Sequence, residues 1–367
     1  MTKVRILLYH GVISDHLESD GRNSSGKHIS ISKFEDQMKF VSKNYNLISM
    51  QEINDFYAGK QKILQDSLAI TFDDGFYNNF SNAWKILEKY NVPATIYLSS
   101  GFLSSKKRIW TDKLEIIFLD PKINFVKING SKKIEFNSLE DRIIELTKLK
   151  KKLKKIKYSN LIKFIKEVTK LNIVNMNILP ELYDFMTWEC VKEMNKSNLI
   201  SFGAHTIDHT SLSKIDFNEA KRQILVSLNE VSSVLGERIK LFSYPEGQID
   251  DFNEKIVKFL KSINLNHCPT AISGNNYLNE SDPFYLKRYF VNGHNNLLEL
   301  LSWKSKDFYF RNYVLNMDVD NVKIKDKIIE LKSNGLSIIE FVKLKKKLKK
   351  LKNNHSNKFM KQLLNSK

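Results

Sequence analysis

Two short stretches of the sequence combine carboxylates and imidazoles at spacings that suit a metal site. Asp73 and Asp74 are adjacent within 71–75 (TFDDG), and His205 and His209 stand four residues apart in HTIDH. Neighbouring carboxylates can point in different directions, so one can bind a cation while the other faces a substrate. Imidazoles at this spacing can converge on one cation if the segment turns. One carboxylate and two imidazoles leave coordination positions open, which is typical of a catalytic site.

Each stretch also has a simpler interpretation. Asp-Gly is a common turn dipeptide, so 71–75 alone is compatible with a tight turn. A single histidine at the end of a strand is often only structural. The metal hypothesis depends on the two stretches lying on the same rim of the fold.

The surrounding pattern predicts such a rim. Apolar runs at 4–9, 67–72, 93–99, 200–204 and 239–244 indicate strands, and a further apolar run lies near 270–272. Helical patterns occur within 34–45, 80–90, 188–194, 218–235 and 253–262. The residues 32–35 (SKFE) fit a capping box at the first of these helices. Strands alternating with helices imply parallel βα units. We expect an α/β fold, an irregular or incomplete (β/α)7 barrel, whose catalytic side chains emerge at the carboxyl ends of the strands.

Two segments interrupt or follow this alternation. Residues 104–182 are predicted to be a helical insertion on one barrel loop. Residues 301–367 are predicted to be a basic helical extension that follows a barrel domain of residues 1–300.

The formal charge of +18 is concentrated in two lysine runs, 148–157 and 343–352, which contain no acidic residue. Leu and Ile recur at helical spacing in both runs, so each is predicted to be a basic amphipathic helix. Such helices are either solvated surfaces or attach to an anionic membrane surface. Nucleic acid is not expected as a partner, because the runs lack the interleaved aromatic residues that single-strand binders use.

With its motifs in view, the sequence resembles the polysaccharide deacetylase family, carbohydrate esterase family 4. Residues 71–75 match the family's first motif, 205–209 its second, and 242–247 (FSYPEG) correspond to its third. The segments 186–205 and 282–288 resemble the branch that acts in bacterial surface-polysaccharide synthesis. The likeness covers roughly residues 3–295, with only a loose match in the insertion.

The resemblance assigns roles to individual residues. It implies that Asp73 is the general base, and that Asp74, His205 and His209 bind a divalent metal, for which zinc is the first expectation and cobalt or nickel also suit the ligands. It implies that a backbone N–H of the third motif, at Glu246, faces the oxyanion.

The sequence departs from the family pattern in two places. Ser243 stands where many members have an arginine that holds the base, so we expect Arg288 to replace it, unless Arg288 is merely structural. The family's late Leu-x-His motif is absent there, and Leu8-Tyr9-His10 supplies that pattern at the start of the chain. The first and last strands of a closed barrel are neighbours, so His10 becomes the candidate general acid. The alternatives are that His10 is only a buried structural histidine at a strand end, and that His294 is the acid.

Trp110 and Tyr244 are the candidate substrate contacts. Trp110 would provide a stacking surface for a sugar if it is exposed, whereas core packing is the alternative. Cys190 and Cys268 lack metal-like spacing and are expected to be reduced packing residues.

Together these features predict a metal-dependent N-deacetylase of an N-acetylhexosamine unit in a glycan or glycan precursor. We weigh against it a hydrolase of another C–N bond such as a formamide, a catalytically silent carbohydrate-binding homologue, and a membrane-surface or nucleic-acid-binding protein driven by the lysine runs. The start of the chain lacks the apolar stretch of a signal peptide, so a cytoplasmic location, peripheral to the membrane, is expected. The oligomeric state is not predicted.

Overall fold

The computed structural model describes residues 2–302 with the exception of 19, 131 and 296. The chain divides into two compact units, Met1–Leu300 and Leu301–Lys367, and the candidate site lies within the first. The lysine run 343–352 falls outside the described residues. Among the described helices, none has the length and apolar character needed to cross a membrane.

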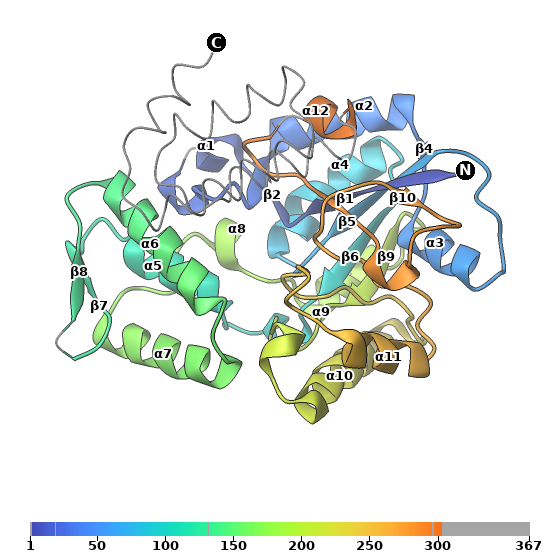
Figure 1. The fold of residues 1–367 in the computed structure, drawn as a ribbon. Helices are drawn as coiled ribbons and strands as arrows, with labels where there is room; N and C mark the ends of the chain where they lie inside the picture. Colours follow the sequence, from blue (N-terminus) through green and yellow to red (C-terminus); the bar gives the residue numbers. More distant parts are fainter. Residues whose placement is uncertain (1, 19, 131, 296, 303–367) are drawn as a thin grey trace, which may run out of the picture. The chain divides into compact units, whose positions relative to one another are not determined.

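A parallel β-sheet forms the core of the first unit. Four strands, β1 (Lys3–Tyr9), β5 (Ser67–Phe72), β6 (Ala94–Leu98) and β9 (Ile200–Ala204), lie side by side in this order (Figure 1). Nearly all of their residues are buried. Such near-continuous apolar runs are expected of parallel strands covered on both faces. The sequence predicts all four strands, and the predicted α/β class is confirmed.

Backbone contacts continue beyond β9 and return to β1. The links are, in order, the Ala204–Phe242 bridge, the Tyr244–Pro269 hydrogen bond, the Pro269–Leu286 bridge and the parallel pairing of β11 (Tyr289–Phe290) with β1. The prediction of a regular strand at 239–244 is wrong, because the described contact there is an isolated bridge, and the apolar run near 270–272 likewise adjoins only the isolated Pro269–Leu286 bridge. Pro245 and Pro269 lack the N–H that a ladder hydrogen bond requires, which explains this irregular side of the ring.

Helices follow the strands and cover the outside of the sheet. The main ones are α2 (Ile31–Asn44), α3 (Met50–Tyr57), α4 (Trp84–Lys89), α9 (Trp188–Met194), α10 (Phe217–Leu235) and α11 (Glu254–Ser262). On α2 the predicted apolar stripe of Phe34, Met38 and Val41 is fully buried. A π-helix, Asn79–Ala83, precedes α4 in the segment that the sequence predicts as one continuous helix.

The predicted capping box at Ser32 and Glu35 is wrong. Helix α2 begins earlier, after Ser30, whose side chain makes no capping hydrogen bond. Glu35 instead accepts hydrogen bonds from Lys89 and Tyr90 at the end of α4. A complete capping box occurs at the next helix, where Ser49 and Glu52 bond each other's backbone N–H groups.

Short elements complete the described fold. They are β2 (Gly11–Ile13), α1 (Asp15–Glu18), β3 (His28–Ser30), β4 (Asn46–Leu47), β10 (Asn276–Tyr277), α12 (Leu297–Ser302) and the 3-10 turns Gly21–Asn23, Ser100–Phe102, Leu212–Lys214 and Pro283–Tyr285. Of these, β2 continues from His10 and pairs with β3 in parallel, so it extends the chain past the carboxyl end of β1.

The insertion is an ordered subdomain with its own hydrophobic core. It contains α5 (Trp110–Phe118), the hairpin β7 (Phe125–Lys127) and β8 (Lys133–Glu135), α6 (Leu139–Leu153), α7 (Tyr158–Leu171) and α8 (Pro180–Tyr183). Figure 1 shows it as a separate lobe at one side of the sheet. Apolar residues from α5, α6 and α7 pack together in one cluster, which fixes the end of α6 relative to the sheet.

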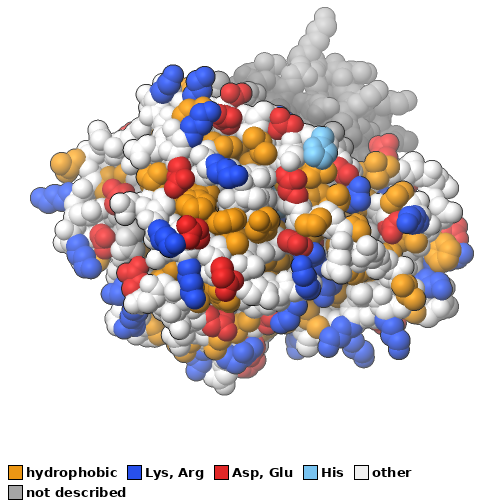
Figure 2. All heavy atoms as spheres, turned by 180° about the vertical axis from the view of Figure 1, so that it is seen from behind, with side chains coloured by type: hydrophobic (Ala, Val, Ile, Leu, Met, Phe, Trp, Pro, Cys, Tyr) orange, Lys and Arg blue, Asp and Glu red, His pale blue; other side chains and the backbone are white. Residues whose placement is uncertain are grey.

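The first lysine run is not a uniform solvated face. Lys150 and Lys154 form ion pairs of 2.5 Å with Glu115 and Glu246, while Lys151 and Lys152 are exposed. On the face shown in Figure 2, basic and acidic side chains are interspersed over much of the surface. Cys190 and Cys268 are buried and free, as the sequence predicts.

Candidate active site

The adjacent carboxylates Asp73 and Asp74 follow β5 directly. The backbone N–H of Asp73 donates to the carbonyl of Tyr9, which ties the turn to the end of β1. Asp74 has a φ of 76° and Gly75 a φ of 86°, so the chain turns sharply at this point. At Gly75 a Cβ would lie 2.8 Å from Leu98, so only glycine fits without a shift.

The two motif histidines follow β9 and lie on the same rim. The N–H of His205 donates to the carbonyl of Leu98, and its Nδ1 lies 2.9 Å from the carbonyl oxygen of Ser243. A carbonyl oxygen only accepts, so Nδ1 carries the proton and Nε2 is left with its lone pair. The turn is held by Gln223, whose side-chain oxygen accepts from the N–H groups of Ile207 and Asp208.

Asp74, His205 and His209 converge as a metal-binding trio would. Their ligand atoms all lie within 4.8 Å of one another. Asp74 Oδ1 is 3.2 Å from His209 Nε2 and 3.8 Å from His205 Nε2, and within the described residues this buried oxygen has no hydrogen-bond partner. An unsatisfied buried carboxylate oxygen facing two imidazole nitrogens fits a divalent cation.

The electrostatics of the trio agree with this fit. Burial and the neighbouring Asp73 carboxylate raise the pKa of Asp74 to about 6, although His209 opposes the shift. Burial lowers the pKa of His205 to about 4, despite the nearby Asp73. His205 is therefore neutral at physiological pH, which is the form of imidazole that binds metals.

Asp73 is held by Arg288 in a bidentate pair. Arg288 Nη1 lies 2.8 Å from Asp73 Oδ1 and Nη2 lies 2.7 Å from Oδ2. The guanidinium is fully buried and also donates to Ser243 Oγ, Thr71 Oγ1 and the carbonyl of Thr270. Burial alone would raise the pKa of Asp73, but Arg288 and His205 lower it to about 2. Asp73 is therefore ionised and fixed in orientation.

This arrangement places Arg288 where the sequence expects it. It also gives Ser243 and Thr71 a part that sequence reasoning missed, since their hydroxyls orient the guanidinium. The replacement of an arginine by Ser243 in the third motif is the signal that points to this contact. The contribution of Thr71 has no such signal, because a threonine in a strand is ordinary.

His10 lies beyond β1 among the same charged groups. It interacts electrostatically with Asp73, Lys27 and His209, while burial lowers its pKa to about 3. Its ring packs edge-on against Phe290 with centroids 5.3 Å apart. The alternative acid, His294, is exposed, its Nε2 donates to the carbonyl of Ser24, and it borders a different cavity with Lys33 and Phe40.

Glu246 in the third motif points its side chain at the insertion. Its carboxylate pairs with Lys154 at 2.5 Å. Burial raises the pKa of Glu246, but Lys154 and His209 outweigh it and leave this pKa lowered. Its backbone has a φ of 61°. At the next residue, Gly247, a Cβ would lie 2.6 Å from the N of Ala271. The sequence gives no signal of the Lys154 contact, because that lysine lies in a run that resembles a solvated helix face.

Backbone strain is concentrated at the three motifs. Among the described non-glycine residues with positive φ are Asp74, Thr206, His209 and Glu246. These side chains cost free energy in the left-handed region, and residues held there cluster at functional sites. The conformations of these motif turns are therefore imposed by the surrounding structure and not by local backbone preference.

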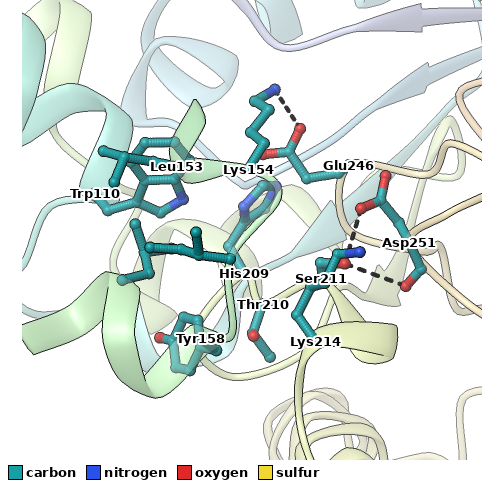
Figure 3. A pocket seen from close by; sticks show the side chains of 12 residues that line it. Trp110, Leu153, Lys154, Tyr158, His209, Thr210, Ser211, Lys214, Glu246 and Asp251 are labelled. Carbon is teal, nitrogen blue, oxygen red and sulfur yellow. Dashed lines mark hydrogen bonds and ion pairs between the residues drawn. The ribbon is translucent and has the colours of Figure 1, made fainter. Parts of the chain in front are cut away.

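A small cavity lies between His209 and the insertion. Figure 3 shows His209 and Glu246 on one side of it and Trp110, Leu153 and Tyr158 of the insertion on the other. The cavity measures about 30 Å³, which is room for about one water molecule. Trp110 is 7% exposed, so it contributes an edge of the wall and is not the open stacking surface considered from the sequence.

Tyr244 does not line this cavity. Its ring stacks on Phe252 with centroids 3.9 Å apart, and its hydroxyl donates to the carbonyl of Phe284. Only 1% of the residue is exposed. The prediction that Tyr244 contacts substrate is therefore corrected: the side chain packs in the core because the third motif turns its neighbours, not this residue, toward the rim.

The sequence pattern of the polysaccharide deacetylase family matches residues 60–267, which is more than half of the chain, and the chain belongs to this family. The matched range contains the motifs around Asp73 and His205. His10 precedes it and Arg288 follows it. Two residues of the candidate site, His10 and Arg288, thus lie outside the matched range.

Individual relatives are similar to this chain at identities between 15% and 28%. YxkH of Bacillus subtilis, whose name places it among the polysaccharide deacetylases, is 28% identical over 116 residues, a match of 31% of this chain and 38% of YxkH. The deacetylase PplD of Streptococcus pyogenes, solved with acetate, has 15% identity and a TM-score of 0.52, covering 82% of this chain and 97% of PplD. IcaB of Ammonifex degensii has 17% identity and a TM-score of 0.52, covering 82% and 95%. At these identities the solved structures establish the fold alone.

Proposed function

We propose that this protein is a divalent-metal-dependent hydrolase that removes the N-acetyl group from an N-acetylhexosamine unit of a glycan or glycan precursor. One observation carries the proposal. The trio of Asp74, His205 and His209 adjoins Asp73, a second carboxylate that Arg288 fixes in position. A site built only for structure has no use for a second, separately held carboxylate beside an incomplete ligand set.

The proposed cofactor is a divalent ion, with zinc expected ahead of cobalt or nickel, held by the trio. When bound, such an ion polarises the acetamide carbonyl and lowers the pKa of a coordinated water. His205 is prepared to hold it, since its Nδ1–H is engaged by the carbonyl of Ser243 and its Nε2 faces Asp74.

Asp73 acts as the proposed general base. Each carboxylate oxygen has two lone pairs, so one stays available after the bidentate contact with Arg288. The fixed carboxylate can thus accept a proton from the attacking water without reorienting. The backbone N–H of Glu246 is the proposed donor to the oxyanion.

His10 acts as the proposed general acid that protonates the departing sugar amine. The lowered pKa means that His10 is neutral before substrate binds. It must therefore first receive the proton that Asp73 takes from water, and then deliver it to the amine. A proton relay of this kind needs Asp73 and His10 on the same rim, and their electrostatic interaction supports it.

Substrate entry requires more room than the cavity offers. A space of about 30 Å³ excludes a sugar, and the wall opposite His209 belongs to the insertion. We infer that the segment around Leu153 and Lys154 moves aside for the substrate, and that Trp110 then contacts the sugar.

The exposed part of the run 148–157, together with 343–352, is the proposed contact with an anionic membrane surface, which suits a cytoplasmic enzyme of surface-polysaccharide synthesis.

The test is acetate release from a panel of N-acetylated glycans and precursors. Wild-type protein should release acetate, lose activity on chelation and regain it when zinc, cobalt or nickel is added. N-formylated analogues distinguish deacetylation from deformylation. Absence of release from every acetylated sugar by fully metal-loaded protein would contradict the proposal.

A further inference from the structure

Three asparagines lie next to the segment that carries His10. Asn78 and Asn79 come shortly after the first motif, and Asn79 and Asn82 lie within the π-helix Asn79–Ala83. A π-helical turn is rare and is frequently found at functional sites, where it redirects side chains that a regular helix would point elsewhere. Here it directs three side-chain amides toward one stretch of backbone.

The amides bond successive peptide groups of that stretch. Asn79 Nδ2 donates to the carbonyl of His10 at 2.9 Å, and Asn82 Nδ2 donates to the carbonyl of Val12 at 2.8 Å. Asn78 Oδ1 accepts from the N–H of Val12 at 3.2 Å. Asn78 and Asn79 are completely buried, and the hydrogen bond between Val12 and Asn78 is shielded from water.

Gly11 shows how close this contact is. A Cβ at Gly11 would lie 2.3 Å from Asn78 Oδ1 and 2.4 Å from His28 Nδ1. Any side chain at position 11 would push the amides away from the backbone. The amides and Gly11 therefore form one unit, which we call the asparagine clamp (Asn78, Asn79, Asn82 and Gly11).

The ring of His10 depends on its backbone for orientation. Its Nδ1 is buried without a hydrogen-bond partner among the described residues. The described ring contact is the edge-on packing against Phe290. Because Nδ1 has no hydrogen bond within the described residues to fix the ring, the place of the ring depends on where the backbone of His10 is held.

We propose that Asn79 is a positioning residue for His10, and that the asparagine clamp holds the general acid at the substrate nitrogen. This inference rests on the proposed function, in which His10 protonates the leaving amine. Asn79 contacts the His10 carbonyl directly, whereas Asn78 and Asn82 fix the next residue along. A shift of the reacting group by about 1 Å is enough to lower turnover roughly 100-fold.

The experiment compares Asn79→Leu, which removes the donor at similar volume, with Asn79→Ser, which is smaller and less disruptive to packing. Asn54→Leu serves as the control, because Asn54 is a buried asparagine on α3 that bonds Asn266 away from the site. Each variant is assayed with an N-acetyl sugar, whose amine needs protonation, and with an aryl acetate, whose leaving group does not. Bound metal is measured in every sample.

We expect the Asn79 variants to keep their metal, to lose roughly 10- to 100-fold in kcat for the N-acetyl sugar with little change in KM, and to hydrolyse the aryl acetate within about three-fold of wild type. In a His10→Ala background, Asn79→Leu should have no further effect on kcat. Asn54→Leu should affect both substrates equally.

The outcomes separate the clamp from the proposed function. Selective loss in His10→Ala but equal loss on both substrates in the Asn79 variants would overturn the clamp and leave the role of His10 intact. Equal loss on both substrates in His10→Ala would overturn the role of His10 itself. A further loss from Asn79→Leu in the His10→Ala background would show that Asn79 acts on the fold and not through His10.

Discussion

The pair between Arg288 and Asp73 should dominate the stability of the site. Arg288 is fully buried and makes contacts of 2.8 and 2.7 Å to the two oxygens of Asp73. Replacing it in Arg288→Met leaves a buried carboxylate without its counter-charge. Breaking a buried pair in this way typically costs about 3–5 kcal/mol. For a unit of this size each kcal/mol lowers Tm by about 2–4 °C, so the expected fall is roughly 6–20 °C.

A double-mutant cycle by urea unfolding of the metal-free protein measures this coupling. Arg288→Met leaves the charge of Asp73 without a partner, and Asp73→Asn removes that charge. The free energy of unfolding of the double variant should therefore fall by at least about 2 kcal/mol less than the sum of the falls in the single variants. Ser243→Ala is the matched control, because it removes a 2.9 Å hydrogen bond to the same guanidinium and keeps the charge pair. Ser243→Ala should lower the free energy of unfolding by about 1.5–3 kcal/mol. Additive single effects, or an Arg288→Met protein as stable as wild type, would refute the buried pair as described.

Three further predictions concern the metal, the insertion and the membrane. His205→Ala and His209→Ala should each lose bound metal and acetate release together, as seen by elemental analysis of purified protein, and full occupancy in either would remove that residue from the site. Lys154→Met should raise kcat/KM for an oligosaccharide by up to about five-fold, because it removes a half-exposed ion pair worth at most about 1 kcal/mol that entry must break. Lys151→Met, on the same helix without that contact to Glu246, should not, and equal effects would argue against a moving wall. Removing residues 320–367 should weaken binding to anionic liposomes and reduce its salt dependence while acetate release from a soluble substrate persists; unchanged liposome binding would exclude the extension as the membrane contact.

The sequence predicts the parts of the fold that have a strong local signal. Strands β1, β5, β6 and β9 are apolar runs of strand length, and each is found where the pattern indicates. The segments near Phe242 and Pro269 have similar apolar character, yet prolines prevent regular ladders there. Periodicity reports burial, and it does not report which N–H groups are free to pair.

The residues of the candidate site also fall into those that the sequence predicts and those that it does not. The trio and Asp73 lie in compact motifs after two strands, so residue type and spacing are sufficient to propose them. Arg288 is inferred from a substitution at Ser243. The Lys154 pair and the asparagine clamp are contacts between residues 66 or more positions apart, as between Val12 and Asn78, and lysine or asparagine alone carries no such signal.

Comparing Asp73→Asn with Asp74→Ala tests most directly the central claim that Asp73 is the general base and Asp74 a metal ligand, because these two adjacent residues are assigned different roles. Metal content and acetate release are measured on the same preparations. We predict that Asp73→Asn keeps its metal and loses roughly 100-fold or more in turnover, since it lacks a proton acceptor, whereas Asp74→Ala loses metal and activity together. Metal loss in Asp73→Asn as large as that in Asp74→Ala would contradict the division of roles between base and ligand.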